Sequence, residues 1–446
     1  MESQGHCTSL SANNPIGDDL RHYRLQCPIC GARFHDDGFL LECPHDHPAT
    51  GLLTTEYRDR TFNPDSSHQG LFRYRRWLPT IRHSSSTGKT VTYRSETLNR
   101  AIGLPNLWIA FSGYFPERGA TLETASFKEL EAHAVFSRLP LSHRDIMVLA
   151  SAGNTAAAFA WICSQNRVPC LIIVPERGLH RMEFFEPLHP CVKVVCLRGL
   201  ANYNDAIALA KRVSQLDGFF PEGGVKNVGR RDGIGTILFN AVETMGQLPD
   251  YYFQAIGSGS GGIAICEAAK RLVADGRFGG TLPRLMLSQN LPFVPIYRAW
   301  SLRCRELGET NGEVGNRQMQ EIVADVLSNQ SPPYGIRGGV FDALSDSGGT
   351  MLAASNEEAL YGVELFREME GADIDPAAGI ALATLMQAAS RKQLDREATI
   401  LLHVTGGGRN RRQRDRRLFP VRTALELEKW ELEDGKALAK IIDLFH

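Results

Sequence analysis

The feature that most constrains the fold of this chain is a repeated succession of short apolar runs, small-residue turns and helix-like segments. The first apolar run, IMVLA, begins at Ile146 and is followed by the helix-like segment NTAAAFAWICSQN. Two further runs, VPCLIIVPE and CVKVVCL, are rich in β-branched residues, and the same succession returns from Tyr251 to Gly408. Buried strands separated by helices are typical of parallel sheets, because parallel strands need a crossover connection. The sequence therefore predicts an α/β fold.

The bulk properties are those of a globular protein with two or three structural units. The 446 residues carry a formal net charge of -1, which creates no global field to attract nucleic acid or an acidic membrane. The apolar run that begins at Gly379 is too short to span a bilayer, and the polar first residues lack the apolar core of a secretory signal. Ten cysteines in such a chain indicate reduced thiols. We therefore expect a cytoplasmic protein with no membrane partner.

A loop rich in glycine and serine separates a predicted strand from a predicted helix. Its residues are Gly257, Ser258, Gly259, Ser260, Gly261 and Gly262. Glycines let the backbone approach a ligand, and successive N–H groups at a helix N-terminus can hold a phosphate. The alternative is a tight turn in which glycine only relieves crowding. The spacing matches a dinucleotide fingerprint only in part, and the Gly-Lys-Ser/Thr ending of a Walker loop is absent.

Two other turns also follow predicted strands. Ser151, Gly153, Asn154 and Thr155 open a helix, where Asn and Thr can cap the helix and leave amide groups for a ligand. Capping alone is the alternative. The segment His403 to Gly408, which contains Thr405, ends the last strong strand. Ligands of open α/β sheets bind outside the carboxyl ends of the strands, so the three turns are expected to meet at one pocket.

Lys128 lies in the stretch TLETASFKELEA, where turn-prone residues give way to a helical pattern. Taken alone, a lysine after a Ser-Phe pair is a solvated surface charge. The segments TASFKELEA, SAGNTAAAFA, GSGSGGIAI and LLHVTGGG, however, occur in the order and context seen in fold-type II enzymes of pyridoxal 5'-phosphate. From about Tyr93 to Gly408 the chain resembles the threonine synthase branch of that family.

The resemblance implies a tryptophan synthase β-like fold with two domains of open twisted sheets and a small N-terminal ribbon-like extension. We place the extension at residues 1–60, the large cofactor-binding domain at 61–145 and 251–446, and a small α/β domain at 146–250. Relatives of this type are commonly dimers, so a homo-oligomer is compatible with the resemblance.

The resemblance also implies roles for individual residues. Lys128 is expected to be the Schiff-base lysine, because a buried amine has its charged form disfavoured and can condense with an aldehyde. Asn154 is placed against the phenolic oxygen of the cofactor, the 257–262 loop around its phosphate, and Thr405 beside its pyridine nitrogen. A neutral hydroxyl there suits elimination and replacement chemistry. The turn with Ser151, Gly153 and Thr155 is expected to bind the substrate carboxylate.

Two departures from threonine synthases bear on the reaction. Glu129-Leu130-Glu131 follows Lys128 in place of Asp-Arg-Gly, and VTYRSETL replaces a Gly-x-Thr-Pro-Leu segment. SFKELEA, together with FRYRRWLP and GYFPERGA, is similar instead to cysteate synthase, an offshoot of threonine synthase. That similarity implies a β-replacement in which O-phospho-L-serine loses phosphate and sulfite adds to an aminoacrylate, giving L-cysteate. The alternatives are threonine synthase chemistry on O-phosphohomoserine and capture of the aminoacrylate by a different nucleophile.

Several arginines are candidates for contact with anions. Departure of phosphate from Cβ requires a cationic or amide-lined pocket, and the local pattern favours Arg94, Arg118 and Arg231, with a surface position as the alternative for each. The run RNRRQRDRR from Arg409 is predicted to be a solvated loop at the pocket rim, where Arg409 could attract an anionic substrate. The run also leaves open a nucleic-acid-binding protein with a decayed enzyme domain, although no aromatic residues interleave it.

The N-terminal region contains a pattern of metal-ligand type. Cys27 and Cys30 have C-x-x-C spacing, and Cys43 with His45 or His47 could complete a tetrahedron. With His45 as the fourth ligand, this set predicts a structural zinc. A metal-free ribbon and a thiol pair are the alternatives.

Overall fold

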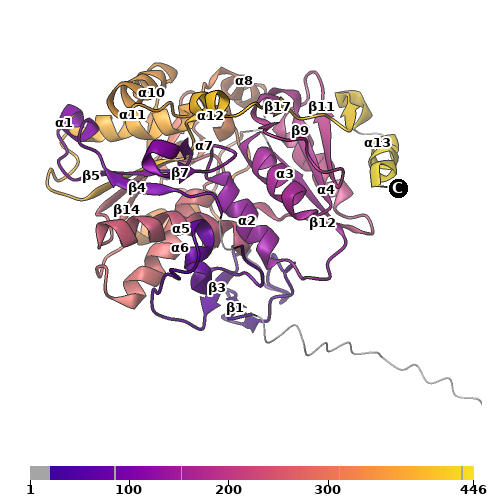
Figure 1. Cartoon of the computed structure of the whole chain (residues 1–446), viewed down its shortest axis with the longest axis horizontal. Helices are drawn as coiled ribbons and strands as arrows, with labels where there is room; N and C mark the ends of the chain where they lie inside the picture. The colour runs from indigo at the N-terminus through magenta and orange to yellow at the C-terminus, as the bar shows by residue number, and fades with distance from the viewer. Residues whose placement is uncertain (1–20, 85–86, 152, 311, 433–434, 446) are drawn as a thin grey trace, which may run out of the picture.

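The computed structural model describes residues 21–84, 87–151, 153–310, 312–432 and 435–445 (Figure 1). The first part of the predicted extension, residues 1–20, and Ala152 of the second predicted turn lie outside this range.

The larger sheet has six strands in the order β15-β14-β13-β16-β5-β4. All neighbours are parallel except β4 and β5, so an antiparallel strand forms one edge. Along β5 the side chains alternate between two hydrophobic clusters, as the two-residue period of a strand requires. The bounds of the six strands are Val91–Arg94 (β4), Leu107–Phe111 (β5), Tyr251–Ala255 (β13), Arg284–Asn290 (β14), Thr350–Ala354 (β15) and Ile400–Val404 (β16).

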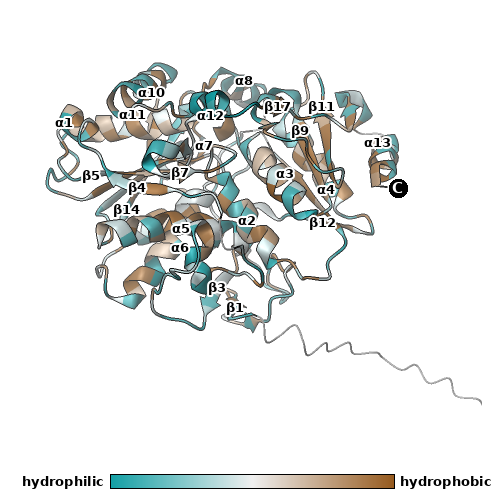
Figure 2. Cartoon of the chain, in the orientation of Figure 1, coloured by the Kyte–Doolittle hydropathy of each residue, from teal (hydrophilic) through white to brown (hydrophobic). Residues whose placement is uncertain are grey.

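The second sheet has five strands, all parallel, in the order β12-β8-β9-β11-β18. Every residue of β9 is buried, because helices cover both faces of this sheet. Figure 2 shows β9 and β11 as largely hydrophobic. The bounds are Ile146–Ala150 (β8), Cys170–Pro175 (β9), Val192–Leu197 (β11), Phe219–Pro221 (β12) and Leu425–Leu427 (β18). Two open, mainly parallel sheets with helical layers confirm the α/β prediction.

The helices form the layers around these sheets. Helix α5 packs against α2 and α6, and α10 packs against α11. Asn202 and Ser355 each begin a helix with a capping box, which explains why α4 and α10 start where they do. The bounds are Leu98–Ile102 (α1), Lys128–Arg138 (α2), Asn154–Asn166 (α3), Tyr203–Val213 (α4), Val228–Met245 (α5), Ser260–Asp275 (α6), Pro295–Ser301 (α7), Glu313–Glu321 (α8), Val340–Asp346 (α9), Asn356–Glu370 (α10), Pro376–Ser390 (α11), Arg409–Asp415 (α12) and Gly435–Ile442 (α13).

A three-stranded antiparallel ribbon precedes the two large sheets. It has the order β2-β1-β3, and its apolar side chains share one hydrophobic cluster with α5 and α6. Its strands are Tyr23–Gln26 (β1), Arg33–Phe34 (β2) and Thr54–Tyr57 (β3). Two short antiparallel pairs complete the strands. Tyr114–Phe115 (β6) and Ala120–Thr121 (β7) form a hairpin, whereas Glu183–Phe184 (β10) pairs with the distant segment Phe419–Pro420 (β17).

The boundaries proposed for the domains stay a prediction. In the sheets themselves, β18 comes from the C-terminal part of the chain yet joins the strands of residues 146–221. Helix α5, which lies within residues 146–250, packs against α2 and α6 and contacts β4 of the larger sheet. The chain therefore passes from one sheet to the other both before α5 ends and before β18 begins, so neither α5 nor β18 belongs to one predicted domain alone.

Candidate active site

A cavity of about 110 Å³ lies where the carboxyl ends of β8, β13 and β16 come together. Most of the residues expected at a ligand site line it, although they come from turns far apart in the sequence. These are Lys128, Ser151, Gly153, Asn154, Thr155, Gly257, Ser258, Gly259, Ser260, Gly261 and Thr405. The three turns therefore meet at one cavity, as the sequence predicted.

The position of Lys128 is set by the segment that precedes it. Residues 125–127 run beside the end of β16: Ser126 forms an antiparallel bridge with Gly406, and the Phe127 N–H donates to the Thr405 carbonyl at 3.0 Å. Helix α2 begins at Lys128. The side chain therefore leaves the first turn of a helix next to Thr405, and both residues line the cavity.

The surroundings of Lys128 make the charged form of its amine less favourable than it is in water. Its side chain is 18% exposed, and Nζ lies 3.3 Å from Glu131 Oε1 and 4.4 Å from the centre of the Phe127 ring. Burial lowers the pKa of Lys128, and the nearby Glu131 carboxylate opposes this only in part. An amine with a lowered pKa in a cavity is a candidate nucleophile.

Behind Lys128 lies a chain of buried charges. Arg230 Nη1 donates to Glu131 Oε1 at 3.0 Å, and Arg230 Nε donates to Glu222 Oε1 at 3.1 Å. The Thr155 hydroxyl lies 3.3 Å from the same Glu131 oxygen. Glu131, Arg230 and Glu222 thus alternate in sign, so the buried guanidinium lies between two carboxylates. Arg230 also lines the cavity, which places a guanidinium close to the candidate nucleophile.

The sequence pattern favoured Arg231, the residue next to Arg230, as a candidate for contact with anions. Arg231 is 1% exposed and points away from the cavity: it binds Glu267 and donates to the carbonyls of Val225 and Leu53. Successive residues of a helix point about 100° apart, so only one of two adjacent arginines can face the site. The sequence shows two adjacent arginines, but it could not show which of them faces the cavity.

The other two arginines expected beside the substrate also lie elsewhere, which corrects their predicted position. Arg94 is exposed at the sheet edge and donates to the carbonyl of Pro105. Arg118 lies over the Tyr93 ring at 4.3 Å and forms an ion pair with Glu370 at 3.7 Å. Because neither lines the cavity, Arg230 replaces them as the candidate cation.

The turn before α3 is held by a residue that was not expected to cap it. Ser151 Oγ accepts from the N–H groups of Gly153 at 3.0 Å and Ala156 at 2.9 Å. This leaves the side chains of Asn154 and Thr155 for other contacts. The Asn154 amide lies between Asp375 at 3.3 Å and Arg409 at 3.0 Å.

The loop before α6 requires glycine for steric reasons. Gly259 has φ +86°, and a Cβ there would lie 2.1 Å from Val340 Cγ2. A Cβ on Gly261 would lie 2.1 Å from the Gln254 side chain. The hydroxyls of Ser258 and Ser260 are 3.0 Å apart at the start of the helix. The loop thus presents backbone N–H groups and two hydroxyls at a helix N-terminus, as an anion cradle does. Gly262, also predicted here, is not among the cavity-lining residues.

The end of β16 combines a buried histidine with the cavity residue Thr405. Burial and the nearby Lys128 lower the pKa of His403 to about 3, so its ring is neutral. The ring nitrogens contact the Tyr252 hydroxyl at 2.8 Å and the Ser112 hydroxyl at 3.1 Å. His403 therefore fixes the strand end and leaves Thr405 as the polar group that faces the cavity.

The arginine run forms helix α12 and not the predicted solvated loop. Arg409 binds Asp375 at 2.7 Å beside the cavity, and Arg411 forms ion pairs with Glu117 and Asp415. Burial would raise the pKa of Asp375, but Arg409 lowers it below its usual value. Two arginines of the run are thus paired with carboxylates of the same protein.

In the ribbon, the three predicted cysteines gather with a different histidine. Ligand atoms of Cys27, Cys30, Cys43 and His47 all lie within 4.8 Å of one another. His45, the ligand expected from the sequence, is exposed: its ring packs edge-on against Phe34, and its Nδ1 lies 3.8 Å from Cys30 Sγ, but it is not part of the four-residue cluster. Only Asp46 separates the two histidines, and His47 is the one whose ring nitrogen lies close to all three thiols.

Comparison with known proteins identifies the family. Residues 84–406 match the family described as "Pyridoxal-phosphate dependent enzyme". The cysteate synthase of Methanosarcina barkeri is 42% identical over 409 residues, which is 91% of this chain and 97% of the relative. The cysteate synthase of Methanosphaerula palustris is 45% identical over 401 residues, which is 90% of this chain and 93% of the relative.

Solved structures agree at the level of the fold. Maize serine racemase superposes with a TM-score of 0.55 at 15% identity, covering 72% of this chain and 88% of that one. Threonine deaminase isoform 2 from Solanum lycopersicum gives 0.56 at 14% identity, covering 71% and 83%. These likenesses support the predicted fold-type II architecture.

The cavity fits pyridoxal 5'-phosphate. It offers an amine with a lowered pKa, a phosphate-type cradle whose glycines have no room for a side chain, and a neutral hydroxyl at a strand end. Among the helices of the described residues, none combines the length and apolar character needed to cross a membrane. With the matches that cover nine-tenths of its length, the chain belongs to the cysteate synthase family of pyridoxal-phosphate dependent enzymes.

Proposed function

We propose that this enzyme converts O-phospho-L-serine and sulfite into L-cysteate and phosphate. In this replacement the Cβ–O bond breaks with its electron pair leaving on phosphate, and sulfite supplies the pair for a new Cβ–S bond. The relatives named cysteate synthase support the reaction. The observation that carries the proposal is one cavity that contains Lys128, the glycine-serine loop of α6 and the guanidinium of Arg230.

Four sets of residues would hold the cofactor. Lys128 Nζ would bond to the aldehyde carbon, and the N–H groups and hydroxyls of residues 257–261 would bind the phosphate. Asn154 would contact the phenolic oxygen, and Thr405 the pyridine nitrogen. When bound, the cofactor supplies an electron sink that acidifies the Cα–H bond of an attached amino acid.

Lys128 is the group that would move the proton at Cα. Its side chain is largely buried, and burial lowers its pKa, which makes the neutral, proton-accepting form of the amine more accessible than it is in water. Glu131 lies 3.3 Å from Nζ and keeps the amine oriented, while Arg230 balances the Glu131 charge. The same amine would return the proton to Cα after sulfite has added.

The substrate's anionic groups have two places to bind. The turn before α3, with Ser151, Gly153 and Thr155, would receive the carboxylate at a helix N-terminus. Arg230 would face the phosphate that leaves and the sulfite that enters, because both are anions that a guanidinium binds well. A guanidinium held by two glutamates needs no reorganisation when the charge arrives.

The first test concerns Lys128. We expect the purified protein to absorb visible light when loaded with the cofactor, and Lys128→Ala to lose this absorbance together with all cysteate formation. Lys270→Ala is the matched control, since Lys270 lies on α6 in an exposed ion pair with Asp346. Retention of the lysine-bound absorbance by Lys128→Ala would contradict the assignment.

The second test concerns the substrates. O-phosphoserine and O-phosphohomoserine are each incubated with the enzyme, with and without sulfite, and phosphate and amino-acid products are measured. Cysteate that appears only with phosphoserine and sulfite together is the expected result. Threonine from phosphohomoserine, or a sulfite-independent product from phosphoserine, would overturn the proposed reaction.

A further inference from the structure

The N-terminal ribbon contains a cluster of ligand-type atoms that the proposed reaction does not use. Its members are Cys27, Cys30, Cys43 and His47, three thiols and an imidazole from two short stretches of chain, residues 27–30 and 43–47. All nine cysteines of the described residues are free thiols. The Sγ atoms of Cys30 and Cys43 are 3.7 Å apart, which is far longer than the roughly 2 Å of a disulfide bond.

Two distances in the cluster match opposite edges of a zinc tetrahedron. Bond lengths of about 2.3 Å to sulfur and 2.0–2.1 Å to nitrogen give a sulfur–sulfur edge of about 3.8 Å and a sulfur–nitrogen edge of about 3.6 Å. The sulfur–sulfur distance between Cys30 and Cys43 is 3.7 Å. The distance from Cys27 Sγ to His47 Nε2 is 3.5 Å. These two edges share no atom, so they support the tetrahedron independently.

The backbone around the first two ligands forms a tight turn that points both thiols the same way. The Cys27 N–H donates to the Ala32 carbonyl at 2.9 Å, and the Gly31 N–H donates to the Cys27 carbonyl at 3.0 Å. Gly31 has φ +71°, a conformation that glycine adopts without strain. The Ile29 N–H points at Cys27 Sγ at 3.4 Å, a contact that would stabilise a thiolate.

The histidine is oriented by a second contact. His47 Nδ1 lies 2.6 Å from the Ala49 carbonyl, which can only accept a hydrogen bond. The proton of a neutral ring therefore sits on Nδ1, and Nε2 presents its lone pair toward Cys27. Fixing of the tautomer by a backbone carbonyl is the usual arrangement behind a metal-bound histidine.

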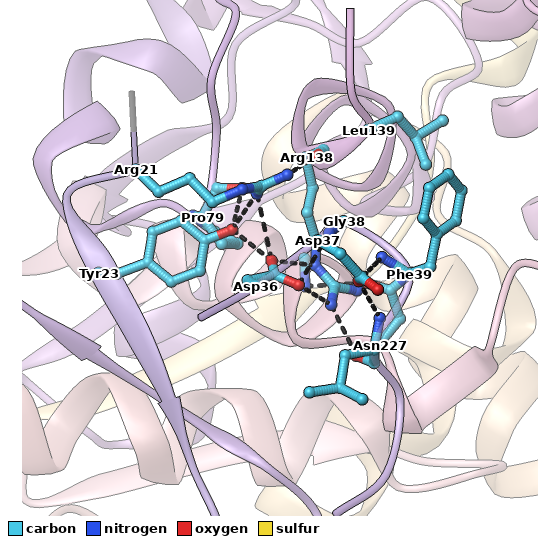
Figure 3. Close-up of polar contacts among 12 residues, drawn as sticks. Arg21, Tyr23, Asp36, Asp37, Gly38, Phe39, Pro79, Arg138, Leu139 and Asn227 are labelled. Carbon is cyan, nitrogen blue, oxygen red and sulfur yellow. Dashed lines mark hydrogen bonds and ion pairs between the residues drawn. The ribbon is translucent and has the colours of Figure 1, made fainter. Parts of the chain in front are cut away.

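The loop between Cys30 and Cys43 connects this cluster to the catalytic helices. Within that loop, Asp36 forms a two-point ion pair with Arg138, the last residue of α2, at 2.7 Å for each bond (Figure 3). Arg138 also donates to Asn227, the N-cap of α5. Helix α2 begins with Lys128, and Arg230 lies in the first turn of α5.

We propose that Cys27, Cys30, Cys43 and His47 form a structural zinc site that fastens the ribbon onto α2 and α5. Three thiolates and an imidazole are the ligands of closed, structural zinc sites, whereas magnesium and calcium prefer oxygen. The metal closes the loop that holds Asp36 in place. Its role is to support the helices that carry Lys128 and Arg230, and it takes no part in the reaction.

The test measures metal content and geometry, so it does not depend on the reaction. We expect about one zinc per chain in the purified full-length protein by mass spectrometry. After chelation and addition of cobalt, tetrahedral absorption bands should appear at longer wavelengths than those of the lysine-bound cofactor. His47→Ala should lose most of the zinc and these bands.

His45→Ala is the matched control, because it removes an imidazole from the same loop without removing a ligand. It should retain about one zinc per chain and the cobalt bands. Chelated wild-type protein should unfold at a lower temperature than the zinc form. A wild-type protein that binds neither zinc nor cobalt would overturn the proposal. So would a cobalt site lost in His45→Ala and kept in His47→Ala, or a Cys30–Cys43 disulfide in the protein as isolated.

Discussion

The buried ion pair between Asp36 and Arg138 gives a prediction whose size follows from the structure. Both side chains are fully buried, and Arg138 makes two bonds to the Asp36 carboxylate. Asp36→Ala leaves Arg138 with only its bonds to Leu40 and Asn227. Removing one partner of a buried pair costs about 3–5 kcal/mol, because the other charge remains without compensation.

This free energy corresponds to a measurable shift of the thermal midpoint. An unfolding entropy of about 2.1 cal/mol/K per residue gives about 0.9 kcal/mol/K for cooperative unfolding of 446 residues. The Tm of Asp36→Ala should therefore fall by about 3–5 °C. Burial would raise the pKa of Asp36, but Arg138 lowers it below its ordinary value. The contribution of the Asp36 carboxylate to the free energy of unfolding is thus present above about pH 4 and is lost as the pH falls below that value.

Scanning calorimetry at pH 7 measures the shift, and two variants serve as controls. Asp59→Ala removes an exposed aspartate whose partner Arg76 is equally exposed, so it should cost no more than about 1 kcal/mol. Asp36→Leu combined with Arg138→Met removes both charges and should be less destabilised than the sum of the two single changes. An unchanged Tm in Asp36→Ala, or a double variant equal to that sum, would refute the reasoning.

Three shorter predictions concern the cavity. In a steady-state assay, Arg230→Met should raise KM for phosphoserine and lower the rate of phosphate release by at least about tenfold, because it removes a charge-paired donor from the cavity. Arg118→Met, a change outside the cavity, should leave both quantities unchanged. Gly259→Ala should weaken cofactor retention, measured by absorbance after dialysis, because the new Cβ would clash with Val340. The control Gly276→Ala, at the other end of α6, has a similar φ of +82° but open space around it, so it should lower the free energy of unfolding by only about 1–2 kcal/mol. Burial raises the pKa of Glu129 to about 7, so the free energy of unfolding should fall as the pH rises from about 4.5 to 7. Denaturation curves of Glu129→Gln should show a smaller fall over this pH range, and an unchanged pH dependence would contradict the assignment.

The elements themselves could be predicted from local pattern. The run IMVLA is strand β8, and NTAAAFAWICSQN is helix α3 from its first residue to its last. Both elements could be predicted from neighbouring residues alone, because a strand buried on two faces is a short apolar run and the helix begins after a turn of small residues. The sequence also predicted the glycine-serine loop and its helix, and the order of four motifs predicted Lys128 as the cofactor-binding lysine. The cofactor contacts assigned to these residues stay predictions.

The structure decided which side chains meet. Arg230 and Arg231 are chemically identical in the sequence, and only the packing of α5 against α2 and α6 turns one toward the cavity and the other toward the ribbon. Asp375 reaches Asn154 across 221 residues of chain, a separation at which no local period carries information. His47, and not His45, completes the cluster for the same reason, because loop geometry determines which imidazole lies close to all three thiols. Periodicity and turn chemistry fix what each segment becomes, whereas the rotation of each helix, and with it the charge that faces the site, is set by contacts between distant segments.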